Sequence, residues 1–176
     1  MGMIGMYVRL RPAEFRRALR EPEWARELAN GLAEAEWAAP EAPSPPPSPP
    51  GAGAARCHST DKAWHALSFL LDRIGFPVDA VHGDAAVPGA SPWGYGPPRH
   101  LAPDRVAAAA EALAATPPDV LVDGVTARDL AAEDVYPAAV WQRGEPLEWV
   151  VDHYRELERF FRGAAREGDG MLVWIE

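Results

Sequence analysis

Residues 147–175 read LEWVVDHYRELERFFRGAAREGDGMLVWI and hold the clearest structural pattern in the chain. Apolar side chains recur at helical spacing from Leu147 to Ala164, which predicts one long amphipathic helix that ends at Gly168. Residues 171–175 are apolar at every position, as is typical of a strand buried on both faces. A long amphipathic helix next to a buried strand predicts a helix that packs on a sheet.

A second strand is predicted at residues 3–10, where apolar side chains recur at every second position. Because two apolar strands need partners, we expect residues 3–10 and 171–175 to be neighbours in one sheet. Further predicted elements are helices that begin at Pro12, Pro22, Asp61, Pro103 and Thr126, a short strand at 78–81 and a loop at 91–98. The sequence therefore predicts an α+β fold, a single domain over residues 1–176. Its small mixed or antiparallel sheet would contain the N- and C-terminal strands and be packed with several helices.

One segment within this domain is incompatible with regular structure. Residues 43–50 read PSPPPSPP, which removes backbone donors and favours solvated polyproline II. We predict a Pro-rich flexible insertion at residues 40–58. We interpret it as a spacer rather than as a ligand of an SH3-type domain, since this composition is common in linkers.

The charge balance excludes some classes of partner. The net charge is −9 and the pI is about 5.0, whereas nucleic-acid binding depends on an excess of Lys and Arg. No apolar run approaches the length of a membrane-spanning helix, so we expect no membrane partner. The single cysteine, Cys57, fits a reducing compartment, and no secretory signal is visible, which together predict a cytoplasmic protein.

The segment 61–74 carries the best candidate for chemistry. If the helix begins at Asp61, then Asp61 and His65 are four residues apart on one face and their side chains can meet. A carboxylate beside an imidazole holds its tautomer, as a general base requires. The alternative is structural: Asp61 caps the helix and His65 is a half-exposed surface residue.

A loop rich in Gly and Pro offers the second half of a candidate pocket. Tyr95 and Arg99 lie in or next to this loop, and both residue types are frequent anchors in binding sites. Among the tryptophans, Trp93 is expected to be exposed. The predicted binding pocket consists of Asp61, Lys62, Trp64, His65, Tyr95 and Arg99, with Lys62, the sole lysine, at the rim.

No metal site and no cofactor are expected. The five histidines form no HxxxH or HExxH pair, and a lone cysteine excludes a Cys-rich zinc site. The Gly94-Tyr95-Gly96 loop lacks the Gly-Lys-Ser/Thr ending of a phosphate-binding loop. No GxSxG motif is present, so no catalytic nucleophile can be assigned.

Several stretches in a fixed order resemble the YfbM-like family of bacterial domains of unknown function. They are Met1-Gly2-Met3-Ile4-Gly5, Asp61-Lys62-Ala63-Trp64-His65, Gly94-Tyr95-Gly96-Pro97 with Arg99, Tyr136-Pro137, and Met171-Leu172-Val173-Trp174-Ile175. The Pro-rich segment is not part of the family pattern. Ala102 also departs from it, because in the family a Thr often precedes the proline that begins this helix, here Pro103. The resemblance implies an α+β fold and no proven chemistry.

Two functions remain open at this point. The first is a binding or protein-interaction module, one form of which is an immunity-like inhibitor that captures a basic partner. Its ligand would be an unknown protein or a small molecule. The alternative is a small hydrolase or transferase that uses the His65/Asp61 pair, so whether the chain is an enzyme stays open. A concave pocket with converging polar groups would favour catalysis.

Overall fold

The computed structural model describes residues 2–38 and 55–176. In these residues the chain forms an α+β domain of eight helices and one five-stranded sheet. The elements in chain order are β1 (Gly5–Leu10), α1 (Pro12–Ala18), α2 (Pro22–Trp37), β2 (Cys57–Asp61), α3 (Trp64–Arg73), β3 (Ala85–Ala86), β4 (Arg99–Leu101), α4 (Pro103–Ala114), α5 (Pro118–Val122), α6 (Ala127–Ala132), α7 (Ala138–Gln142), α8 (Glu148–Glu167) and β5 (Gly170–Ile175).

The sheet has the strand order β2-β1-β5-β4-β3, and every neighbouring pair is antiparallel. The pairing of β1 with β5 runs without a break from Gly5 opposite Ile175 to Leu10 opposite Gly170. The predicted fold class and the predicted pairing of the N- and C-terminal strands are therefore confirmed.

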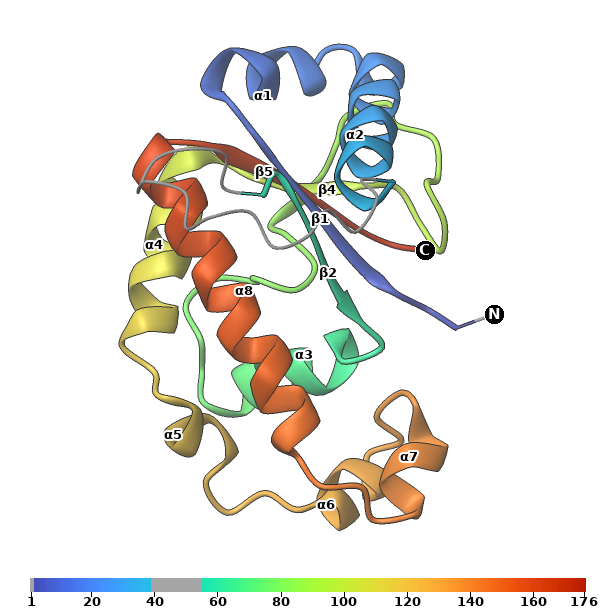
Figure 1. The fold of residues 1–176 in the computed structure, drawn as a ribbon, viewed down its shortest axis with the longest axis vertical. Helices are drawn as coiled ribbons and strands as arrows, with labels where there is room; N and C mark the ends of the chain where they lie inside the picture. The colour runs from blue at the N-terminus through green and yellow to red at the C-terminus, as the bar shows by residue number, and fades with distance from the viewer. Residues whose placement is uncertain (1, 39–54) are drawn as a thin grey trace.

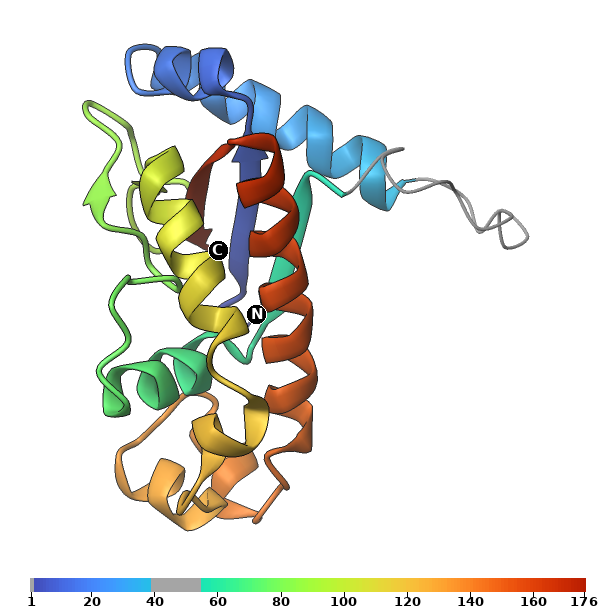
Figure 2. The same ribbon diagram turned by 90° about the vertical axis from the view of Figure 1, so that its left-hand side faces the viewer.

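Helices cover both faces of the sheet, with α4 and α8 on one side and α2 on the other (Figure 1). The alternation of side chains along β1 explains this arrangement. Tyr7 points into a cluster with Leu157 and Phe161 of α8, whereas Val8 points into a cluster with Ala25 of α2. In the side view, α4 and α8 lie next to each other against the sheet, and α5 and α6 lie below it (Figure 2). None of the described helices is long and apolar enough to cross a lipid bilayer.

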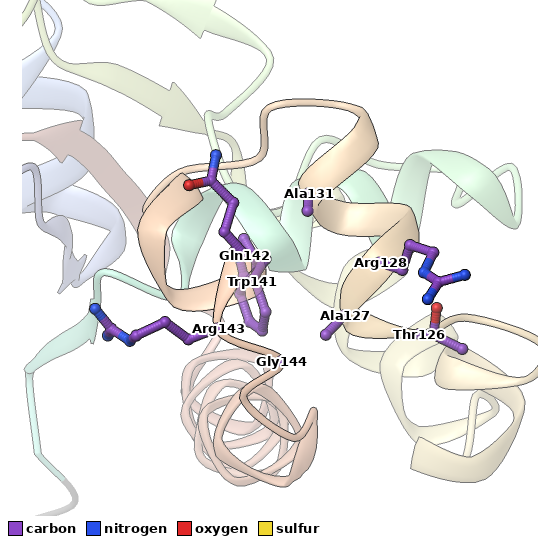
Figure 3. A pocket seen from close by; sticks show the side chains of 8 residues that line it. All are labelled: Thr126, Ala127, Arg128, Ala131, Trp141, Gln142, Arg143 and Gly144. Carbon is purple, nitrogen blue, oxygen red and sulfur yellow. The ribbon is translucent and has the colours of Figure 1, made fainter.

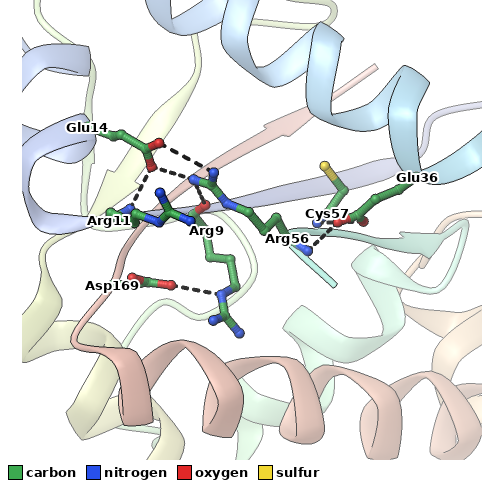
Figure 4. A network of polar contacts seen from close by, with 7 residues as sticks. All are labelled: Arg9, Arg11, Glu14, Glu36, Arg56, Cys57 and Asp169. Carbon is green, nitrogen blue, oxygen red and sulfur yellow. Dashed lines mark hydrogen bonds and ion pairs between the residues drawn. The ribbon is translucent and has the colours of Figure 1, made fainter. Parts of the chain in front are cut away.

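A polar network fixes the corner where β1, β2 and α8 meet (Figure 4). Arg9 Nε donates to Asp169 Oδ2 at 2.8 Å, and this ion pair is buried. On the other side of β1, Arg56 pairs with Glu14 and also donates to the carbonyl of Arg9 at 3.1 Å. These contacts connect α1 and the turn between α8 and β5 to the sheet.

The helix predicted from Asp61 begins three residues later, at Trp64. Asp61 is instead the last residue of β2 and has a left-handed backbone, with φ at 46°. The following turn is closed by the bond from Ala63 N to Thr60 O at 2.9 Å. The prediction that Asp61 opens the helix was wrong, because pairing with β1 draws the polar residues 57–61 into the sheet.

Three other expectations need correction. Residues 78–81 form no strand, and the sheet is extended instead by the short strands β3 and β4. Trp93 is buried, since its indole packs on Trp174 at 5.2 Å between ring centroids. Strand β2 includes positions 57 and 58, the last two of the predicted insertion. Positions 40–54 of that insertion lie outside the described residues, so the prediction for them stays a prediction.

Candidate binding site

A cavity of about 290 Å³ opens beside the C-terminal end of β5. Its floor is the apolar edge formed by Val173 and Ile175, and Val81 adds another apolar wall. The rim carries two aromatic residues, Trp64 and Tyr95, and the polar residues His82 and Arg99. A small, mostly apolar hollow with few polar groups is the usual form of a ligand pocket.

The loop that carries Tyr95 is anchored to the strand by its backbone. Tyr95 N donates to Ile175 O at 2.9 Å, and Trp93 N donates to Gly96 O at 3.0 Å. A Cβ at Gly94 would lie 2.4 Å from Ile175 O, so only glycine allows this close approach. The loop therefore holds Tyr95 in place while 65% of its surface stays exposed.

Trp64 forms the opposite wall and is held by several ring contacts. Its Nε1 donates to Met3 O at 3.2 Å, and its ring stacks on His65 at 5.0 Å between centroids. Tyr136 stacks nearby at 6.0 Å, and His82 meets the Trp64 ring edge to face at 5.9 Å. This aromatic wall is rigid because each ring is packed on another.

The polar rim is already engaged in internal contacts. His82 N donates to Asp79 Oδ1 at 2.8 Å, and the His82 ring lies 3.3 Å from the same oxygen. Although partial burial opposes it, these contacts with His82 hold the pKa of Asp79 below its usual value. The Arg99 guanidinium donates to Gly83 O at 3.1 Å and to Asp84 O at 3.0 Å.

Three of the six predicted site residues line this cavity: Trp64, Tyr95 and Arg99. Lys62 is exposed and lies beside Gly2, where an added Cβ would come within 2.7 Å of Lys62 Cε. Asp61 lies at the end of β2, and its N–H donates to Ser59 Oγ at 3.0 Å. Neither Lys62 nor Asp61 lines the cavity.

His65 lies behind Trp64 and not at the cavity surface. Its Nδ1 accepts the N–H of Tyr136 at 2.9 Å, so the neutral ring carries its proton on Nε2. Burial, with a smaller contribution from His82, lowers the pKa of His65. Asp61 and His65, both described residues, are not joined by a hydrogen bond, so the expected pair of carboxylate and imidazole is not formed.

Sequence reasoning missed Asp79, which lies in the segment 78–81 expected to be a strand, and His82, which directly follows that segment. A turn in this segment brings the carboxylate of Asp79 back to His82, three residues later. An Asp side chain can bond the backbone a few residues on, but Asp79 is followed by the apolar residues Ala80 and Val81, so this turn carries little signal in the sequence.

A larger but shallower hollow lies between α6 and α7 (Figure 3). The ring of Trp141 stands between the two helices, while the side chains of Arg128 and Arg143 extend away from each other. No polar groups converge there, so this hollow is the weaker candidate. Across residues 2–38 and 55–176, no group of three or more His, Cys, Asp or Glu side chains could hold a metal ion.

The fold and this pocket define a class of protein: an α+β domain with a five-stranded antiparallel sheet and an apolar pocket at the C-terminal end of β5. The family model described as Domain of unknown function (DUF1877) matches residues 1–174, and the chain belongs to this family. The crystal structure of YfbM from Escherichia coli, a protein of unknown function, shares the fold with a TM-score of 0.60. The two chains are 15% identical, and the match covers 98% of this chain and 99% of that chain. The resemblance to the YfbM-like family is thereby confirmed. No curated protein matches the chain.

Proposed function

We propose that this protein is a binding module whose pocket between Trp64 and Tyr95 receives an apolar side chain of a partner protein. The observation that carries the proposal is the display of Tyr95, which is 65% exposed although its backbone is fixed to Ile175. Tyr and Trp supply large contact areas at low entropic cost and are enriched among the residues that dominate binding energy.

The chemistry of the pocket favours an apolar group over a charged one. Val81, Val173 and Ile175 present carbon to the cavity, and burial of one large apolar side chain stabilises a complex by about 1.5–3 kcal/mol. The polar side chains at the rim already make internal contacts, since His82 contacts Asp79 and Arg99 donates to two backbone carbonyls. These contacts reduce what the rim offers to a charged ligand.

The charge of the whole chain supports a basic partner. At −9 it attracts a positively charged protein over long range, which raises the association rate at low ionic strength. An inhibitor of the immunity type is one module with this charge relation to its target. The alternative, a hydrolase or transferase that uses His65 with Asp61, gains no support, because Nδ1 of His65 is taken by the Tyr136 N–H.

A peptide-display selection against the full chain tests the proposal. We expect enriched peptides to share an aromatic or large aliphatic residue, and we expect the Tyr95→Ala variant to bind them at least tenfold more weakly, because it loses the exposed ring. Tyr95→Phe keeps the ring and is the matched control that retains binding. Equal binding of these peptides to wild type and Tyr95→Ala would overturn the proposed pocket.

A further inference from the structure

A second cavity, of about 310 Å³, lies on the other end of the sheet against α8. Its polar lining consists of Arg9, Arg159 and Glu156, and its less polar wall consists of Cys57, His58 and Phe160. The His58 ring stacks on Phe160 at 5.2 Å between centroids, so this wall is aromatic. The cavity shares no residue with the pocket at Tyr95.

Arg9 is the unusual member of this cavity. It is only 6% exposed, and its Nε donates a hydrogen bond to Asp169. Among the described residues, neither terminal nitrogen of Arg9 donates a hydrogen bond. A guanidinium carries five donors, so the terminal nitrogens of Arg9 keep donors that a ligand in the cavity can engage. The close view shows the two terminal nitrogens beyond Asp169, directed toward α8 (Figure 4).

The surface of α8 is shaped to accept this guanidinium. A Cβ added at Gly163 would lie 2.8 Å from Arg9 Nη1, so any side chain there would displace the group. Gly163 lowers the stability of the helix, since glycine is less favourable than alanine in a helix interior. Its absence of a side chain leaves the terminal nitrogens of Arg9 at the floor of the cavity.

We propose that this cavity binds a carboxylate attached to a flat apolar group. The terminal nitrogens of Arg9 form a planar fork that matches the two oxygens of a carboxylate, and Arg159 adds a second positive charge. Asp169 and Glu156 offset these two charges, which favours a monoanion over a dianionic phosphate. The flat apolar part of the ligand lies against His58 and Phe160. The thiol of Cys57 stays protonated, because burial raises its pKa to about 12, and takes no covalent part.

The test is an NMR titration of the full chain with benzoate, with benzamide as the neutral probe of the same shape. The Arg9 Nε–H is held by Asp169 at 2.8 Å and provides a local signal at the floor of the cavity. We expect benzoate to shift this signal saturably and benzamide to leave it in place. A shift that does not saturate, or equal shifts with both probes, would overturn the site.

Two exposed arginines on α8 give a matched pair of variants. Arg159→Gln removes the second charge of the cavity and should weaken benzoate about tenfold, the effect of one charge-assisted hydrogen bond. Arg155 lies one turn away, outside the cavity, and Arg155→Gln should leave binding unchanged. Equal losses in both variants would mean general charge attraction and would contradict the proposal. Tighter binding of phenyl phosphate than of benzoate would contradict the assignment to a monoanion.

Discussion

The imidazole of His65 accepts a hydrogen bond from the backbone N–H of Tyr136, and this contact indicates a structural role for His65. We predict that His65→Ala lowers the free energy of unfolding by about 1–2 kcal/mol, because the partly buried Tyr136 N–H loses its acceptor. His65→Asn keeps an acceptor near the same position and should recover part of the loss. Urea denaturation of both variants checks this. An unchanged denaturation midpoint in His65→Ala would contradict the structural role of His65.

His58 makes the stability of the protein sensitive to acid. Burial, with a smaller contribution from His153, lowers its pKa from 6.5 to about 4. In the unfolded chain the ring takes up a proton near pH 6.5, whereas the folded chain resists this, so stability is full above that pH and falls as the pH drops toward 4. The loss from this residue is at most about 3 kcal/mol.

The comparison with His58→Gln isolates this effect from that of the carboxylates. Glutamine cannot take up a proton, so the variant should lose less stability than the wild type between pH 6.5 and pH 4. Thermal denaturation across this range provides the measurement. Parallel pH profiles for the two proteins would show that His58 is not responsible.

At the scale of elements, α8 is connected to β5 by a turn that depends on Gly168. This residue has φ at 68°, and Asp169 N donates back to Ala164 O at 3.0 Å, which closes the helix end. Gly168→Ala should cost about 1 kcal/mol, although the space around it is open, since an L side chain is strained in this conformation.

A glycine elsewhere on a helix provides a control of opposite sign. Gly31 lies inside α2 with open space around it and without a left-handed backbone. Gly31→Ala should therefore raise stability by about 0.5–1 kcal/mol. Calorimetry of both variants tests the pair, and stabilisation by Gly168→Ala would rule out the proposed helix end.

The elements that could be predicted from sequence are those whose own side chains carry an apolar pattern. Helix α8 and strand β1 have a periodic pattern, and β5 has a continuous apolar run and pairs with β1 along its whole length. Strand β2 reads CHSTD, and its pairing with β1 comes from backbone bonds that leave no hydrophobic period. Strand β4 has three residues, too few for a period of two to be recognised.

At the scale of the whole molecule, contacts between distant parts of the chain limited how much of the site could be predicted. Trp64, Tyr95 and Arg99 were predicted together and do line one cavity, which lies beside the C-terminal end of β5. Asp61 was placed by a helix wheel whose starting residue was three positions too early. His65 and Tyr136 are 71 residues apart, and a single sequence carries no signal for such a contact.

The insertion provides a prediction at this scale. We predict that replacement of residues 40–53 by a short Gly/Ser loop leaves the melting temperature nearly unchanged, because the entropy of loop closure varies slowly with length. These residues lie outside the described ranges, so the prediction rests on composition alone. Differential scanning calorimetry measures it, and a drop of more than about 4 °C, equivalent to more than about 1 kcal/mol in a domain of this size, would mean that the segment packs on the domain.

The central claim is that Tyr95 meets a partner protein, and site-specific photocrosslinking tests it most directly. A photoreactive phenylalanine analogue is incorporated in place of Tyr95 and, in a parallel sample, in place of Val120. Val120 is 50% exposed and lies on α5, outside the Tyr95 pocket, so it controls for random collisions. We predict a discrete crosslinked protein at position 95 that is absent at position 120. No crosslink at position 95, or the same products at both positions, would contradict the claim.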